Sequence, residues 1–143
     1  MKVVFDTNVV LDFVYDREPD SSYAARLFTA AEERKIEGYL GAITVTTIHY
    51  LTTKLTGPRE SKHLIKNLLD IFLIAPVNDL ILKDAFESDW NDFEDAVLHQ
   101  SAVHADIGFI VTRNTKDFKK ANIPVYTPRD MLKAWSSMDH GKQ

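Results

Sequence analysis

Residues 2–8 read KVVFDTN, and this stretch decides the fold that we expect for the rest of the chain. The apolar run from Val3 to Phe5 is typical of a short buried strand. Asp6 follows it directly. Open α/β sheets bind their ligands just outside the carboxyl ends of their strands. If the remaining pattern predicts a parallel sheet, Asp6 therefore stands where chemistry is expected.

Beyond this stretch, short apolar runs alternate with helical patterns. One predicted helix begins at Asp20 or Ser21 and is stopped by Gly38. The other predicted helices cover residues 44–54, 59–71 and 91–105 and segments that begin at 79 and 128, and the predicted strands are 39–43, 72–75, 109–111 and 125–126. This alternation predicts a three-layer α/β/α fold around a central parallel sheet of about four to five short strands.

Length and composition limit the alternatives. The chain has 143 residues, which suits one domain; we expect it in residues 1–135, followed by a polar tail in residues 136–143. Cysteine is absent, which excludes disulfides and thiolate metal sites and favours a reducing, cytoplasmic setting. No stretch is long enough to cross a bilayer, so no membrane contact is expected. The net charge of -4 argues against a protein that coats nucleic acid non-specifically.

Acidic residues follow the predicted strands or open a predicted helix. Asp6 follows the first strand, Asp95 lies in the first turn of a helix, and Asp117 lies just beyond the strand at residues 109–111. In a parallel sheet, Asp6 and Asp117 emerge at the same edge. Carboxylates that converge repel one another unless they are protonated or hold a cation. Oxygen ligands of this kind suit Mg²⁺ or Mn²⁺.

Each of these acids also has a purely structural interpretation. Asp6 is suited to capping the turn after its strand. Residues 91–95 hold two possible helix-capping pairs, and Asn114 with Asp117 has the same spacing. Only the combination of acids at related places indicates a metal site.

These same residues resemble the motifs of the PIN-domain family. Its opening D-x-N element looks like Asp6-Thr7-Asn8, its central D-A element looks like Asp95-Ala96, and its late T-R-N-x-x-D-F element looks like residues 112–118. The three motifs occur in the family's order, and the similarity extends from Val3 to the Thr127-Pro128 step. The resemblance implies a parallel sheet between helices and metal-dependent cleavage of RNA.

The resemblance also implies particular residue roles. Asp6, Asp95 and Asp117 become the catalytic metal ligands for Mg²⁺ or Mn²⁺. The residues expected to orient or bind the substrate are Asn8, Thr112, Arg113 and Asn114, with Arg113 as a phosphate contact. Many bacterial and archaeal members resemble VapC toxins, which implies a homodimer and a cognate antitoxin partner. An RNA-processing nuclease outside toxin–antitoxin systems is the alternative within the same class.

The sequence departs from the family at one position. PIN nucleases usually carry a glutamate on the helix after the second strand, but residues 44–50 read TVTTIHY, and Thr47 stands at the expected place. A subgroup with the wording DFEDA, found here at residues 92–96, looks similar in this respect. Glu94 then becomes the candidate for the missing metal ligand. Weaker metal binding is one alternative, and a PIN fold that binds without cutting is another.

Two basic groups are candidates for RNA contact. Residues 59–66 carry basic side chains on one helix face, although an ordinary solvated face is favoured there. Arg113, Lys116, Lys119 and Lys120 lie nearer the proposed acids. A phosphatase that uses Asp6 as its nucleophile is a different kind of enzyme. It needs a second aspartate two positions later, where this chain has Asn8.

Overall fold

The computed structural model describes the backbone of residues 1–141 and the side chains as far as residue 138. Its elements, in chain order, are β1 (Lys2–Phe5), α1 (Thr7–Val14), α2 (Asp20–Glu32), β2 (Glu37–Gly41), α3 (Ala42–Thr56), α4 (Pro58–Ile71), β3 (Leu73–Ala75), α5 (Asp79–Glu87), α6 (Phe93–His104), β4 (Phe109–Val111), the 3₁₀ turn η1 (Thr115–Phe118), β5 (Val125–Tyr126) and α7 (Pro128–Gly141). The predicted alternation of strands and helices is confirmed.

The five strands form one parallel sheet in the order β3-β2-β1-β4-β5. The chain moves from β1 outward to β2 and β3, then returns to the other side of β1 for β4 and β5. The strand order therefore reverses between β1 and β4, which is the switch point at which doubly wound folds bind ligands. Phe5 pairs with Val111 in register, so Asp6 and Thr112 leave the sheet side by side.

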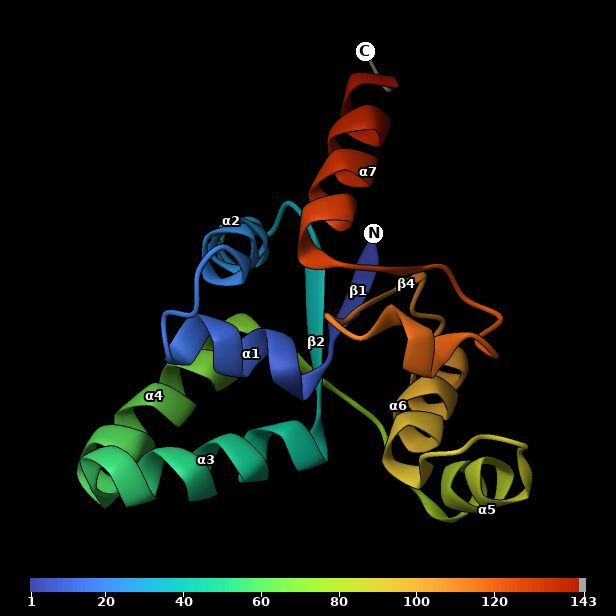
Figure 1. The fold of residues 1–143 in the computed structure, drawn as a ribbon, viewed down its shortest axis with the longest axis horizontal. Coiled ribbons are helices and arrows are strands. Elements are labelled where there is room, and N and C mark those ends of the chain that lie inside the picture. Colours follow the sequence, from blue (N-terminus) through green and yellow to red (C-terminus); the bar gives the residue numbers. More distant parts are fainter. Residues whose placement is uncertain (142–143) are drawn as a thin grey trace.

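Side chains of the central strands alternate between two apolar layers, as the pleat of a strand requires. Val3 and Phe5 pack into the core formed with α1, α2, α3, α4 and α7. Val4 and Ile110 face the opposite layer, where residues of α6 such as Ala102 complete the packing. Figure 1 shows the sheet at the centre, with α1 to α4 on one side and α5 and α6 on the other. The three-layer α/β/α prediction is confirmed.

The N-terminal helix α1 was not predicted. Asp6 ends β1 and also caps α1, since its carboxylate accepts a hydrogen bond from the Thr7 backbone N–H at 2.8 Å. No loop separates the strand from the helix, so the sequence contains no turn signal at this point. Val9 and Val10 are buried against the core and fix the helix there.

The expected stop of the second helix at Gly38 is wrong. Helix α2 ends at Glu32, and Arg34 takes the left-handed conformation with φ 61°. The N–H groups of Arg34 and Lys35 return to the carbonyls of Ala31 and Ala30, which is a Schellman cap. Gly38 lies inside β2, and the strand predicted at 39–43 runs from Glu37 to Gly41.

The predicted division at residue 135 falls inside α7, which continues to Gly141, while residues 142–143 lie outside the described residues. A single domain of residues 1–135 with a tail of residues 136–143 stays a prediction. Within the described part of the chain, no helix is both long enough and apolar enough to cross a membrane.

Gly38 gives a test of core packing. A Cβ at this position would lie 2.8 Å from Cδ1 of Phe72 and 3.1 Å from the Ala31 Cβ. The Phe72 ring is held edge-on between Phe5 and Phe28, so it has little room to move. We predict that Gly38→Ala lowers the free energy of unfolding by about 1–3 kcal/mol, the usual range for overpacking.

Urea unfolding of the variant and the native chain measures this difference. Gly108→Ala is the matched control, because its Cβ would meet only the Lys2 carbonyl oxygen at 3.8 Å, an ordinary contact. Equal destabilisation by the two substitutions would contradict the idea that a Cβ at position 38 overpacks the core.

Candidate active site at the carboxyl ends of the strands

Asp6 is fixed by hydrogen bonds from both sides of the switch point. One carboxylate oxygen accepts from the Thr7 N–H at 2.8 Å, and the other accepts from the Thr112 hydroxyl at 2.9 Å. The Asn8 amide lies 3.4 Å from this second oxygen. The structural interpretation of Asp6 as a cap is thus correct, and it does not compete with a functional one, because capping holds the carboxylate at the sheet edge.

Asp95 lies in the first turn of α6, but it is not the cap of that helix. The Asp92 carboxylate accepts a hydrogen bond from the Asp95 N–H at 3.0 Å, so Asp92 is the N-cap. Of the two capping pairs that the sequence offered, the structure forms the one between Asp92 and Asp95. The Asp95 side chain is thereby left for another role.

The acids influence one another electrostatically. Burial raises the pKa of Asp95 to about 7, and the nearby charges of Asp6, Asp92, Asp117 and Glu94 add to the rise. Burial also raises the pKa of Asp6, although hydrogen bonds from Thr112 and Thr7 oppose this, and the charges of Asp92 and Asp117 raise it further. Because the charges of Asp6 and Asp117 both act on Asp95, the three carboxylates lie in one region of the molecule, as the sequence predicted.

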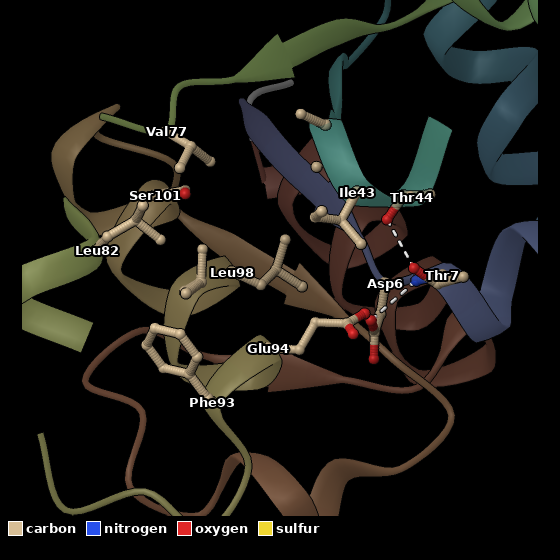
Figure 2. Close-up of a pocket in the computed structure, with 13 residues that line it drawn as sticks. Asp6, Thr7, Ile43, Thr44, Val77, Leu82, Phe93, Glu94, Leu98 and Ser101 are labelled. Atoms are coloured by element: carbon tan, nitrogen blue, oxygen red, sulfur yellow. Dashed lines mark hydrogen bonds between the residues drawn. The ribbon is translucent and has the colours of Figure 1, made fainter. Parts of the chain in front are cut away.

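The acids line two clefts. Asp6 and Glu94 line an apolar cleft of 360 Å³, whose walls include Ile43, Val77, Leu82, Phe93 and Leu98. Figure 2 shows Glu94 extending from α6 toward Asp6 at one end of this cleft. The second cleft, of 240 Å³, is lined by Asp92, Asp95 and Asp117 together with Lys116, Lys119 and Lys120. The site therefore has an apolar side and a side where lysines surround the acids.

The donor set suits a hard divalent cation, since carboxylate oxygens are the ligands of Mg²⁺ and Mn²⁺. Within residues 1–138, however, no three acidic or histidine side chains are arranged closely enough to hold an ion. The assignment of Asp6, Glu94, Asp95 and Asp117 as metal ligands stays a prediction.

Two threonines near Asp6 were missed by the sequence reasoning. The hydroxyls of Thr7 and Thr44 lie 2.7 Å apart and share a hydrogen bond, and both residues line the apolar cleft. Thr44 is buried in the first turn of α3, close after β2. The rule that sites lie beyond strand ends points to Thr44. The sequence comparison with the family drew attention instead to Thr47, which is not among the lining residues of this cleft.

The remaining predicted residues form a network around Asp6. The side-chain amide oxygen of Asn8 accepts from the Arg113 N–H at 3.1 Å, and the Thr112 hydroxyl accepts from the Asn114 N–H at 3.2 Å. The guanidinium of Arg113 bonds to the buried Asp12, at 2.9 Å and 3.2 Å from its two carboxylate oxygens. The basic residues at 59–66 line a separate depression on α4 that contains none of these acids.

A parallel sheet whose strand order reverses beside a group of interacting carboxylates defines a class of α/β proteins with an acidic site at the switch point. A sequence model of the PIN-domain family matches residues 2–116. The chain therefore belongs to the PIN-domain family. A search of curated proteins finds no match.

Solved structures of similar fold are consistent with this assignment. A toxin–antitoxin complex from Klebsiella pneumoniae superposes with a TM-score of 0.66 at 22% identity over 88% of this chain and 97% of that one. VapBC2 from Rickettsia felis, bound to a DNA fragment from its promoter, superposes with a TM-score of 0.65 at 16% identity and covers 88% of this chain and 97% of that one. A DNA-bound VapBC from Salmonella typhimurium superposes with a TM-score of 0.66 at 13% identity and covers 90% of this chain and 98% of that one. At these identities, the likeness establishes a shared fold.

The raised pKa of Asp95 predicts a gain in stability when its charge is removed. The pKa of Asp95 is about 7 in the folded chain, compared with 3.8 for an unperturbed aspartate, so ionisation of Asp95 destabilises the fold as the pH rises through this range. We expect Asp95→Asn to raise the free energy of unfolding at pH 8 by on the order of 1 kcal/mol, allowing for solvent screening of this half-buried group.

Urea unfolding at pH 8 and near pH 4 measures the difference, which should shrink at the lower pH because both chains then carry a neutral side chain. Asp79→Asn is the control, since Asp79 occupies the first turn of α5 and pairs with Lys83 at 2.8 Å. A destabilised Asp95→Asn variant at pH 8 would contradict the electrostatic picture.

Proposed function

We propose that this protein is a metal-dependent endoribonuclease, and that it acts as the toxin of a VapC-type toxin–antitoxin pair. The observation that carries the proposal is the group of mutually interacting acids, centred on Asp95, at the switch point of a PIN-domain sheet. Membership of the PIN-domain family supports the nuclease activity, and the toxin–antitoxin complexes among structures of similar fold support the toxin role. Such an enzyme meets its RNA substrate in the cytoplasm.

In this proposal, Asp6, Glu94, Asp95 and Asp117 hold Mg²⁺ or Mn²⁺. A bound divalent cation lowers the pKa of a water molecule and neutralises charge on the phosphate that is cut. The protein's own contribution is to orient the carboxylates. The Thr112 hydroxyl and the Thr7 N–H fix both oxygens of Asp6, which keeps this ligand from rotating away.

The walls of the site suit a nucleic acid. Lys116 and Lys119 line the cleft that contains Asp95 and Asp117, where they can pair with phosphates on either side of the cut bond. Phe93 packs edge-to-face with Phe86 but remains 51% exposed at the edge of the apolar cleft, where its accessible surface suits contact with a base. The substrate-binding roles predicted for Asn8, Thr112 and Asn114 remain proposals of the same kind, whereas the guanidinium of Arg113, predicted as a phosphate contact, is paired with Asp12 in this structure.

Glu94 is the candidate for the carboxylate that α3 lacks. It lines the cleft beside Asp6, and its charge contributes to the raised pKa of Asp95. Consecutive residues on a helix point in directions about 100° apart. Glu94 and Asp95 therefore present carboxylates to the two different clefts from one turn of α6.

The apolar cleft next to the acids suits a protein partner. A segment with apolar side chains would bury Ile43, Leu82 and Phe93, and a basic residue on that segment would reach Asp6 and Glu94. A cognate antitoxin that binds there would block the site. We also propose a homodimer, which would cover exposed apolar residues such as Tyr50 and Leu55 on α3. The apolar face of α2 is not available for this, because residues such as Leu27 are buried in the core.

A second candidate function is a PIN fold that binds RNA or protein without cutting. It is favoured by the spacing of the acids, since no group of three within residues 1–138 is close enough to hold an ion. It is also favoured by Thr47, which stands where the family usually has a glutamate. An RNA-processing nuclease outside toxin–antitoxin systems shares the chemistry and differs only in substrate and partner.

Cleavage of a mixed RNA pool tests the proposal. With Mn²⁺ or Mg²⁺, we expect the native chain to cut RNA, EDTA to stop the reaction, and Asp95→Asn to lower the rate by about 100-fold or more, because a ligand to the ion is lost. Asp79→Asn, an exposed acid in the first turn of α5, should cut at the native rate. Failure of the native chain to cut, together with no binding of Mn²⁺ in calorimetry, would support the binding module instead.

Glu94→Gln tests the replacement of the missing glutamate. The change removes a charge without altering size, so we expect Mn²⁺ affinity to fall by about tenfold or more, because affinity depends on the number of charged ligands. Isothermal titration calorimetry measures this directly. Glu87→Gln, an exposed glutamate at the end of α5, is the control. Native Mn²⁺ affinity in Glu94→Gln would exclude Glu94 as a ligand.

A further inference from the structure

We propose that the ion pair between Asp12 and Arg113 is a positioning device for the acidic site, and that Arg113 acts through this pair rather than by contacting RNA. The pair would fix the loop after β4 against α1, so that Thr112 holds the carboxylate of Asp6 in place. The part of this proposal that concerns activity rests on the proposed nuclease function. The part that concerns the position of the loop does not.

Asp12 is a charged residue at a buried position of α1, which is unusual. It lies on α1, and its side chain is only 1% exposed. A buried carboxylate is costly unless it is paired and hydrogen-bonded. Burial raises the pKa of Asp12, and the Arg113 guanidinium opposes that rise. Asp12 is among neither the family motifs nor the residues that line the two clefts. Its burial therefore calls for an explanation other than direct contact with substrate.

Arg113 contacts α1 at two points that lie one turn apart. Its guanidinium bonds to both carboxylate oxygens of Asp12, at 2.9 Å and 3.2 Å. Its backbone N–H donates to the side-chain oxygen of Asn8 at 3.1 Å, and Asn8 precedes Asp12 by one helical turn. Two contacts on one helix face prevent the residue from pivoting. The loop after β4 is therefore held at a fixed height along α1.

This fixed loop carries the groups that orient the acids. Thr112 immediately precedes Arg113, is fully buried, and donates to Asp6 at 2.9 Å. The Asn8 amide bridges the Thr112 hydroxyl at 3.3 Å and the Asp6 carboxylate at 3.4 Å. On the other side, the N–H of Asp117 donates to the carbonyl of Asn114 at 3.0 Å, which ties this acid to the same loop. Movement at Arg113 would therefore reach Asp6 and Asp117 together.

Neutralising Asp12 does not by itself require Arg113, because a second arginine is present. Arg17 lies 3.4 Å from the same carboxylate, and its side chain is 46% exposed, compared with 40% for Arg113. The two arginines thus share one buried partner and a similar environment. Arg17 also lies over the Tyr15 ring, at 4.9 Å from its centroid. The difference that matters here is that only Arg113 belongs to the loop that holds Asp6. This difference provides a matched pair of variants.

The test compares Arg113→Met with Arg17→Met, since each retains an apolar stem and leaves Asp12 one arginine partner. The first readout is amide hydrogen exchange by NMR in the full chain without metal. In Arg113→Met, we expect hydrogen exchange at the backbone N–H groups of positions 113 and 114 to be about tenfold or more faster than in Arg17→Met, because the loop then opens locally. Equal exchange at these amides in the two variants would overturn the proposal, whatever the chain's activity.

The second readout is RNA cleavage with Mn²⁺. We expect kcat of Arg113→Met to fall by about tenfold or more with KM nearly unchanged, because small displacements of catalytic groups slow the chemical step. Arg17→Met should stay near the native kcat, and Arg113→Lys should recover part of the loss. A rise in KM with unchanged kcat and a weaker salt dependence would overturn the proposal in favour of a direct phosphate contact. If the native chain cuts no RNA, the nuclease proposal fails, and the exchange measurement still decides the positioning role.

Discussion

The parallel pairing of β1 with β4 is the constraint on which the site depends. Phe5 and Val111 are register partners, so the first residue after each strand, Asp6 and Thr112, must emerge together at one edge of the sheet. The two residues are 106 positions apart in sequence, yet their side chains meet in a hydrogen bond of 2.9 Å. A slip of one residue in this register would turn the side chains of the slipped strand to the other face of the sheet, so that Asp6 and Thr112 would no longer meet. The apolar layers on both sides of β1 resist such a slip, because Val4 and Phe5 fill different cores. Packing that stabilises the fold therefore also sets the geometry of the acids.

The acids themselves oppose stability. Asp95 is surrounded by the charges of Asp6, Asp92, Asp117 and Glu94, and its raised pKa means that folding at neutral pH holds charge where burial disfavours it. Such local conflict with the rest of a well-packed domain is expected at functional sites and is uncommon elsewhere. Asp12 is a useful contrast within the same chain. Its side chain is only 1% exposed and burial raises its pKa, but two arginine partners within the protein oppose that rise. Among the described residues, Asp6, Asp95 and Asp117 form no ion pair, although lysines line the cleft that holds the last two, so an external cation or a basic group on a partner is a reasonable counter-charge in the proposed function.

The sequence predicted the parts of this structure that depend on local signals. The apolar runs at β1, β4 and β5 are short and bounded, and their limits agree with the structure. Helix α1 was missed because Asp6 both ends a strand and caps a helix, which leaves no turn between them. The end of α2 was misplaced because Arg34, and not a glycine, takes the left-handed conformation. Asp6, Asp95 and Asp117 could be found because strand ends and helix starts are visible in sequence. The pairing of Asp12 with Arg113 could not be predicted from the sequence, because no local rule links two residues that far apart.

Helix α3 carries no acidic residue, and this affects the balance of charge at the site. Thr44 and Thr7 form a neutral hydroxyl pair beside Asp6, in the cleft that Glu94 also lines. A carboxylate on α3 would add repulsion to a cluster in which the pKa of Asp95 already reaches about 7. Moving that charge to Glu94, next to Asp95 on α6, keeps the number of acids but places two of them on a single helical turn. The N-terminus of a helix favours negative charge, so α6 tolerates these acids better than a position further along a helix would. If Glu94 is a ligand as we propose, the DFEDA stretch would let the chain retain an acidic site without a glutamate on α3.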